Sequence, residues 1–118
     1  MKSSGGFPRR GEVWLVNFNP GRGSEQKGIR PALVIQNDIG NEHGSTTIVA
    51  AITTTIKPYP VAVLLSKGSA GLDKDSMVNL AQLLTVDKTR LIRKLGELDA
   101  NHVAQTNQAL KISLSLAE

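Results

Sequence analysis

The sequence predicts an α+β domain, built as a small and mostly antiparallel β-barrel with one C-terminal helix. Short apolar and β-branched runs recur between residues 11 and 98, and glycine, proline or polar residues separate them. Short strands that are broken by such turns usually curl into a small barrel. Apolar residues at helical spacing follow Asp99, which places one helix at the C-terminal end.

The first predicted strand covers residues 11–18 (GEVWLVNF), and the Asn-Pro-Gly turn that follows ends it. A second strand is expected to begin at Pro31, because a strand tolerates proline at its first residue. Residues 37–45 (NDIGNEHGS) predict a long polar loop. All the strands after the first are predicted over 31–36, 46–55, 61–66, 76–86 and 94–98.

Two aspartates indicate helix starts. Asp87 is expected to cap a single turn over 88–92, and Asp99 is expected to cap the C-terminal helix. In that helix Val103, Leu110 and Leu114 fall on one face, which is expected to pack on the sheet.

Length and composition indicate one globular domain. The chain has 118 residues, of which 40% are apolar, and this is enough for one modest core. Residues 1–8 are expected to form a disordered tail, and residues 9–118 a single domain. We find no secretion signal, no cysteine, and no apolar run near the roughly 18 residues of a membrane span. Together these features favour the cytoplasm.

The chain is basic. Lysine and arginine number 14 against 10 acidic residues, which gives a net charge of +4 and an isoelectric point near 9.7. This charge suits a polyanionic partner such as a nucleic acid or an acidic peptide. Many small proteins carry the same charge without such a partner, so charge alone assigns no function.

The residues give little support to a metal or cofactor site. His43 and His102 have no partner at ligand spacing, so a solvated loop and a helix surface are their expected places. No nucleophile elbow for a Ser-His-Asp triad is present. The glycine-rich stretch at 21–28 (GRGSEQKG) lacks the P-loop lysine and the dinucleotide spacing. The prediction is therefore no metal and no cofactor.

The stretch GSEQKGIRPALVIQND (23–38) places an arginine at the mouth of a buried strand. Arg30 is fixed there by the proline after it, and its fork of donors matches two phosphate oxygens. The threonines at 53–55 end another strand, and one of their hydroxyls would complete a phosphate clamp. An ion pair of Arg30 with Glu25 or Asp38, and the β-propensity of threonine, explain the same residues. The residues alone leave both interpretations open.

Several stretches carry a resemblance to a known family. They are RGEVWLVNFNP (10–20), GSEQKGIRPALVIQND (23–38), TTIVAAIT (46–53), KPYPVAV (57–63) and DSMVNLAQLLTVDKTRL (75–91). Through them the chain resembles the MazF/PemK/Kid family of toxin endoribonucleases over about residues 9–116. A glycine loop, polar residues and an Arg-Pro pair that opens a hydrophobic strand are rare together, so the second stretch is specific.

The resemblance implies an SH3-like barrel of the CcdB/PemK type that works as a homodimer. Members of the family cut single-stranded RNA, mostly messenger RNA, at short sequence motifs and without a metal, which inhibits translation and growth. A cognate antitoxin, usually acidic and with a disordered C-terminal segment, blocks the RNA groove. Binding to operator DNA is expected, if at all, only of the toxin–antitoxin complex.

The resemblance also implies the site. The catalytic arginine and threonine of the family fall on Arg30 and Thr53, and its loop glutamate falls on Glu25. The 2′-hydroxyl of the substrate would attack the adjacent phosphorus, and Arg30 and Thr53 would donate to the equatorial oxygens. Glu25 is the only carboxylate nearby in the sequence, and it is the candidate base or a residue of the RNA groove. The residues expected to contact RNA are Ser24, Gln26, Lys27, Tyr59 and Gln82.

The chain departs from the family at a few positions. Ala81 stands where some members have an acid–base carboxylate, and Leu84 stands where an arginine is common. Asn17 and Asn19 replace aspartates of related members. These departures leave the cleavage rate and the base preference undetermined. Two alternatives to an endoribonuclease are a CcdB-like toxin that binds DNA gyrase without catalysis and a general SH3-like nucleic-acid-binding module.

Overall fold

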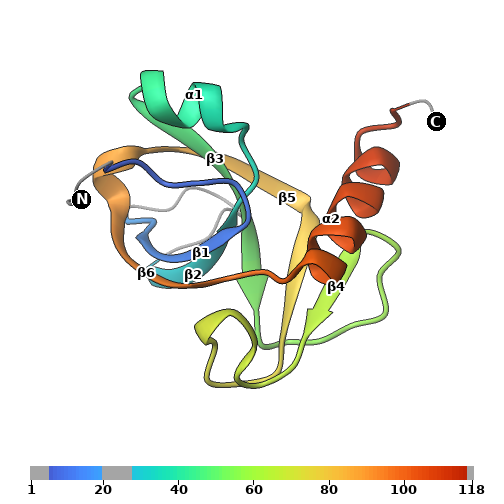
Figure 1. The fold of residues 1–118 in the computed structure, drawn as a ribbon. Helices are drawn as coiled ribbons and strands as arrows, with labels where there is room; N and C mark the ends of the chain where they lie inside the picture. Colours follow the sequence, from blue (N-terminus) through green and yellow to red (C-terminus); the bar gives the residue numbers. More distant parts are fainter. Residues whose placement is uncertain (1–5, 20–27, 117–118) are drawn as a thin grey trace.

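The computed structural model describes residues 6–19 and 28–116 (Figure 1). Within these residues six strands form one sheet in the order β4-β5-β3-β2-β1-β6, and all neighbours are antiparallel. The strands are β1 (Glu12–Asn17), β2 (Ile29–Val34), β3 (Thr46–Thr53), β4 (Ala62–Leu65), β5 (Ser76–Asp87) and β6 (Leu91–Glu97). The helices are α1 (Asp38–His43) and α2 (Ala100–Ser113), with short 3₁₀ turns η1 (Ser69–Gly71) and η2 (Lys88–Arg90).

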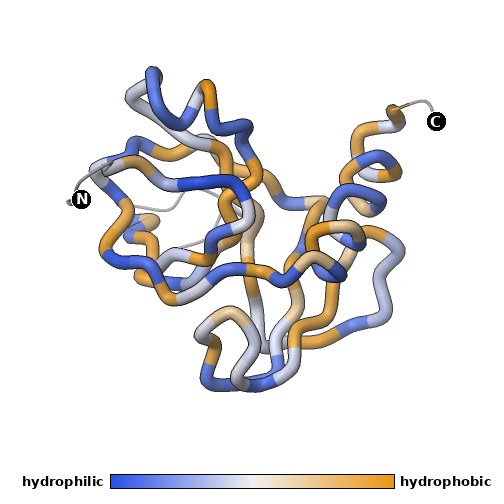
Figure 2. Tube along the Cα trace, in the orientation of Figure 1, coloured by the Kyte–Doolittle hydropathy of each residue, from blue (hydrophilic) through white to orange (hydrophobic). Residues whose placement is uncertain are grey.

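Alternate residues of the strands pack into two apolar clusters. The helix-covered core includes Val13, Leu33, Ala50, Ile52, Val78 and Leu80 from the sheet, with Ala109 and Leu110 from α2. The second core consists of Val16, Phe18, Ala32, Val34, Val49, Val86 and Leu91. The period of two along each strand sends neighbouring residues to opposite faces, so β1, β2, β3 and β5 each contribute to both cores. Figure 2 shows hydrophobic positions recurring along the strands, whereas α1 is mostly hydrophilic.

The α+β class and the antiparallel sheet are confirmed, but the sheet is not a closed barrel. In the described part of the chain, the edge strands β4 and β6 each pair on one side only. The turn η1 instead packs against β6 without a ladder. The approach is so close that a Cβ built on Gly71 would overlap the carbonyl of Leu95, and one on Gly96 would overlap the backbone of Ala70. The turn η1 and the edge strand β6 are therefore joined by backbone packing rather than by hydrogen bonds between strands.

The prediction of a loop over 37–45 is wrong, because α1 lies there. Asn37 caps this helix, and its Oδ1 accepts a hydrogen bond from the N–H of Gly40 at 2.8 Å. Asp38 adds an acidic residue to the first turn, which the helix dipole favours. The pair Asn37-Asp38 is the feature of the sequence that could have predicted the start of this helix. A helix this short is unstable by itself.

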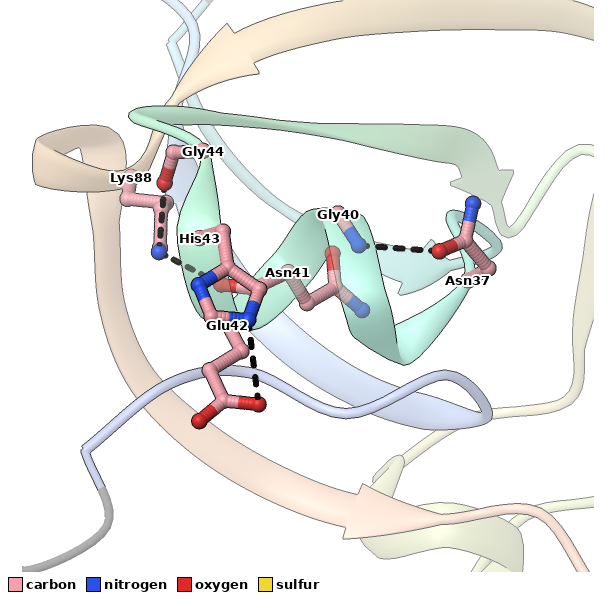
Figure 3. Close-up of polar contacts among 7 residues, drawn as sticks. All are labelled: Asn37, Gly40, Asn41, Glu42, His43, Gly44 and Lys88. Carbon is pink, nitrogen blue, oxygen red and sulfur yellow. Dashed lines mark hydrogen bonds and ion pairs between the residues drawn. The ribbon is translucent and has the colours of Figure 1, made fainter.

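Contacts with distant residues hold α1 in place (Figure 3). Asn41 is fully buried, and its Oδ1 accepts from Thr47 Oγ1 at 2.6 Å and from Gln36 Nε2 at 3.0 Å. At the end of the helix, Lys88 Nζ donates to the carbonyls of Asn41 at 2.5 Å and Gly44 at 2.7 Å. These bonds satisfy carbonyls that a helix leaves without partners.

The C-terminal helix is confirmed, with Asp99 at its N-cap accepting from the N–H of His102 at 2.9 Å. Two details differ from the prediction. Leu114 follows the end of α2 and is 51% exposed, so it does not belong to the packed face. Asp87 precedes η2 but makes no side-chain cap.

The second strand begins before Pro31, not at it. Pro31 is the third residue of β2, and it lies opposite Leu15 of β1. It is tolerated there because the ladder with β3 begins only at Ala32, so β2 has a single paired neighbour at the proline.

The predicted division at residue 8 stays a prediction, because residues 1–5 lie outside the described residues. Pro8, within the predicted tail, is fully buried. None of the helices in the described ranges is long and apolar enough to cross a membrane.

Candidate active site

Arg30 lies near the start of β2, where the sheet holds its backbone from one side. It pairs with Val16 of β1, which is completely buried in the second core, while Arg30 itself is exposed. Paired residues of antiparallel strands direct their side chains to the same face. The guanidinium therefore extends from the face that carries the second core, near the end of the sheet where β2 begins.

Thr53 is the last residue of β3 and lies at the same end of the sheet. The ladder between β2 and β3 ends with Ala32 opposite Ala51. When that register is extended by two residues along each strand, Arg30 comes opposite Thr53. The extended register therefore puts the two predicted catalytic residues on the same face and at the same end of neighbouring strands, although they are far apart in the sequence.

The hydroxyl of Thr53 is oriented by its own turn. Its Oγ1 accepts from the N–H of Thr55 at 3.0 Å, a local bond of the kind that ends strands. Thr54 and Thr55 are exposed beyond the strand. Because the hydroxyl oxygen acts as an acceptor in this bond, its proton can still be donated to an anion.

Gln82 lies in an irregular part of β5 beside the same strand. Ala50 of β3 pairs with Leu83, whereas the next residue, Ala51, pairs with Asn79. The extra residues form a bulge, and bulges often re-aim side chains next to active sites. Gln82 is half-buried in this bulge, beside Ala50 and Ala51 of β3, whereas Thr53 itself pairs with Met77.

Tyr59 lies apart from this site. It is 49% exposed and lines a hollow of about 420 Å³ beside β4, together with Ile56 and Leu64. In the sheet order, β5 and β3 separate β4 from β2 (Figure 1). Tyr59 is thus grouped with residues around β4 rather than β2, and its contact with RNA stays a prediction.

Four predicted site residues lie outside the described residues: Ser24, Glu25, Gln26 and Lys27. The ends of the segment that carries them are described. Asn19 and Gly28 meet there, and the guanidinium of Arg90 donates to the carbonyl of Asn19. Sequence reasoning gave Arg90 no role, because only the register of β1 with β6 brings it to this place.

Neither histidine belongs to the site. His43 is 73% exposed on α1 beside Glu42, and His102 forms a 2.9 Å contact with Asp99 at the start of α2. The described residues contain no group of three or more histidine, cysteine, aspartate or glutamate side chains that could hold a metal. The side chains at the site are instead donors, which suit an anionic group such as a phosphodiester.

Comparisons with known proteins agree with this geometry. The family model described as PemK-like, MazF-like toxin of type II toxin-antitoxin system matches residues 9–114. The chain is 47% identical over 110 residues to a protein named Endoribonuclease MazF from Staphylococcus saprophyticus, and the match covers 92% of each chain.

Two solved structures have the same fold. One is an endoribonuclease from a mycobacterial species in complex with its cognate antitoxin, with a TM-score of 0.81, 26% identity, and coverage of 94% of this chain and 98% of that one. The other is MazF from Deinococcus radiodurans, with a TM-score of 0.80, 28% identity, and coverage of 93% and 98%. The resemblance seen in the sequence is thus confirmed, and the chain belongs to the family of PemK-like, MazF-like toxins of type II toxin–antitoxin systems.

Proposed function

We propose that this chain is the toxin of a type II toxin–antitoxin pair and acts as a metal-independent endoribonuclease. Its substrate is single-stranded RNA, mostly messenger RNA, which it cuts at short preferred sequences to stop translation and growth. The observation that carries the proposal is the placement of Arg30 and Thr53 at one end of neighbouring strands, in a chain 47% identical to an endoribonuclease. Family membership also disfavours the alternative of a CcdB-like gyrase poison.

The chemistry follows from the residue types. The 2′-hydroxyl of the substrate attacks the adjacent phosphorus, the bond to the 5′-oxygen breaks, and the products carry 2′,3′-cyclic phosphate and 5′-hydroxyl ends. Negative charge grows on the equatorial oxygens, where Arg30 and Thr53 donate hydrogen bonds worth about 3–4 kcal/mol each to the transition state. A 2′-hydroxyl nucleophile also explains the choice of RNA over DNA.

The reaction needs one proton removed from the 2′-hydroxyl and one delivered to the leaving 5′-oxygen. Arginine remains protonated in proteins, so Arg30 is not the base. We propose Glu25 as the base. The proposed RNA contacts are Ser24, Gln26, Lys27, Tyr59 and Gln82.

Partners follow from the same assignment. A mycobacterial endoribonuclease of this fold has been solved in complex with its cognate antitoxin. We infer that this chain also has a cognate antitoxin, which covers the RNA groove with an acidic C-terminal segment. The toxin works as a homodimer in the cytoplasm, where its substrate is, and any binding to operator DNA belongs to the complex with the antitoxin.

A cleavage assay in EDTA tests the proposal. Purified protein is incubated with a long single-stranded RNA and with a copy that carries 2′-deoxy nucleotides, and the product ends are identified. We expect cleavage of the RNA alone, with cyclic phosphate ends, and loss of cleavage in Arg30→Ala. Cleavage of the deoxy copy, or full activity in folded Arg30→Ala, contradicts the mechanism. Intact RNA after incubation with well-folded wild-type protein contradicts the function.

A further inference from the structure

Asn19 joins three segments at one point, just beyond the end of β1. Its N–H donates to Asn17 Oδ1 at 3.0 Å, and its own Oδ1 accepts from the N–H of Gly28 at 2.9 Å. Its main-chain carbonyl accepts from the guanidinium of Arg90 in η2. One residue therefore ties the end of β1, the approach to β2 and the start of β6 together.

Gly28 is held on both sides by this arrangement. Its N–H is bound by Asn19, and its carbonyl accepts from the N–H of Phe18 at 2.8 Å. Its φ of +76° is one that glycine adopts readily and other residues avoid. A Cβ there would meet nothing within 4 Å, so the backbone angle and not the space requires glycine. The bonds to Asn19 and Phe18 thus fix an unusual conformation immediately before β2.

Arg30 follows two residues later, in a part of β2 that pairs with β1 alone. Ile29 and Arg30 are both exposed. They pair with β1, but the ladder with β3 begins only at Ala32. Strand ends with one neighbour and exposed side chains are where local opening begins. A donor that stabilises a transition state must be held to about 0.5 Å, so this strand end needs an additional anchor.

We propose that Asn19 is a positioning residue for Arg30: through Gly28 it fixes the start of β2 and so aims the guanidinium at the phosphate. The inference rests on the proposed function, because it concerns the same site. Asn19 does not touch the reacting atoms in this scheme. Its side chain acts only as an acceptor for the N–H of Gly28. A carboxylate at the same place would accept the same hydrogen bond.

The test compares variants that keep or remove this acceptor. Asn19→Ala removes it, and Asn19→Asp keeps it. The matched control is Asn37→Ala, which removes another bond from an asparagine Oδ1 to a glycine N–H, that of Gly40 at 2.8 Å. Asn37 precedes α1, beyond the far end of β2, so the control disturbs stability without approaching Arg30.

We expect Asn19→Ala to lower kcat by roughly 10- to 100-fold on a long single-stranded RNA, because small misplacements of a catalytic group cost this much. KM should change by less than about threefold, since uniform binding is retained. Asn19→Asp should restore kcat, with any effect of its charge confined to KM. Asn37→Ala should keep the kcat of the wild type even where its melting temperature falls.

Two further readouts separate positioning from general stability. The amide of Gly28 should exchange slowly with deuterium in the wild type and in Asn19→Asp, and quickly in folded Asn19→Ala. In an Arg30→Ala background, Asn19→Ala should give no further loss of the single-turnover rate, because the two residues act through one donor.

The outcomes distinguish this inference from the proposed function. If the wild type cuts RNA and Arg30→Ala does not, the function stands. In that case, an unchanged kcat in Asn19→Ala overturns the positioning role alone, and so does a double variant that falls below whatever residual single-turnover rate Arg30→Ala retains. If the wild type leaves RNA intact, the proposed function and this inference fall together.

Discussion

At the scale of single residues, the two proposed catalytic side chains are held by different means. The backbone of Arg30 is aligned by the ladder with β1, opposite the buried Val16. Thr53 ends its strand, and its hydroxyl is oriented by the N–H of Thr55. The backbones of both residues therefore depend on neighbouring strands, since Thr53 pairs with Met77 of β5, but only the hydroxyl of Thr53 has a local bond that orients it. Substitutions at Thr53 can separate its chemistry from its structural role.

Removing the hydroxyl of Thr53 should lower the rate of cleavage strongly and the free energy of unfolding only slightly. Thr53→Val keeps the branched shape but loses one donor, and such losses cost about 10²- to 10³-fold in kcat. Thr53→Ser keeps both the donor and the acceptor for Thr55, so most of the rate should remain. Single-turnover cleavage with excess enzyme measures both variants. Comparable rates for Thr53→Val and the wild type would remove Thr53 from the mechanism.

The cap of α2 should make stability depend on acidic pH. The pKa of the Asp99 carboxyl is lowered from 3.8, chiefly because the backbone N–H of His102 donates to it. A depressed pKa in the folded state means that the stabilisation is present above pH 3.8 and is lost as the pH falls through the folded pKa.

Melting temperatures of the wild type and Asp99→Ala should therefore differ at pH 7 and converge well below pH 3.8. Asp99→Ser, which keeps a capping oxygen without a titrating group, should show no such convergence with Asp99→Ala. A gap between wild type and Asp99→Ala that is constant over this range would show that the charge of Asp99 has no part in the cap.

At the scale of elements, the sequence predicts those parts that depend on local pattern. The strands follow from alternating apolar residues, and α2 follows from the cap at Asp99 and its helical spacing. The helix α1 does not, because Gln36, Thr47 and Lys88 stabilise it from outside. The site divides in the same way. The resemblance of their stretches proposes Arg30 and Thr53 as site residues, but no stretch predicts the contact of Arg90 with Asn19, since it depends on how β1 meets β6.

The buried Asn41 should be the most sensitive residue of α1. Asn41→Ala leaves the buried hydroxyl of Thr47 without its acceptor and removes one of the two acceptors of the Gln36 amide, which should cost about 2–4 kcal/mol of unfolding free energy. Glu42→Ala, on the same helix but 56% exposed, should change it by less than about 0.5 kcal/mol. Urea denaturation compares the two, and equal losses would contradict the role of the buried amide.

At the scale of the whole molecule, the open sheet depends on the contact between η1 and β6. Gly71 and Gly96 allow the backbones of η1 and β6 to touch. In a closed barrel, hydrogen-bonded strands would make this connection instead. Contacts between η1 and β6 connect the hairpin of β4 and β5 with the opposite edge of the sheet. A side chain at this contact should disturb both edges at once.

Gly71→Ala should destabilise the protein more than Gly68→Ala does. Both glycines have positive φ, +78° and +92°, so each alanine carries a backbone cost of roughly 1–2 kcal/mol. Only at Gly71 does the new Cβ meet the carbonyl of Leu95, and overpacking adds about 1–3 kcal/mol. Chemical denaturation of both variants measures the difference. Equal destabilisation would mean that η1 can move away from β6 at no cost.

The strand order also has a consequence for synthesis on the ribosome. The first strand, β1, has β6 as one of its two neighbours, and Glu12 lies opposite Glu97. At about 5–20 residues per second, the nascent chain waits several seconds between making β1 and making the strand that completes it. Arg30 is held by β1, and β1 has both of its neighbours only after β6 has been made. A chain that is truncated before β6 therefore lacks a finished site. The site should become complete only once nearly all of the chain has been translated.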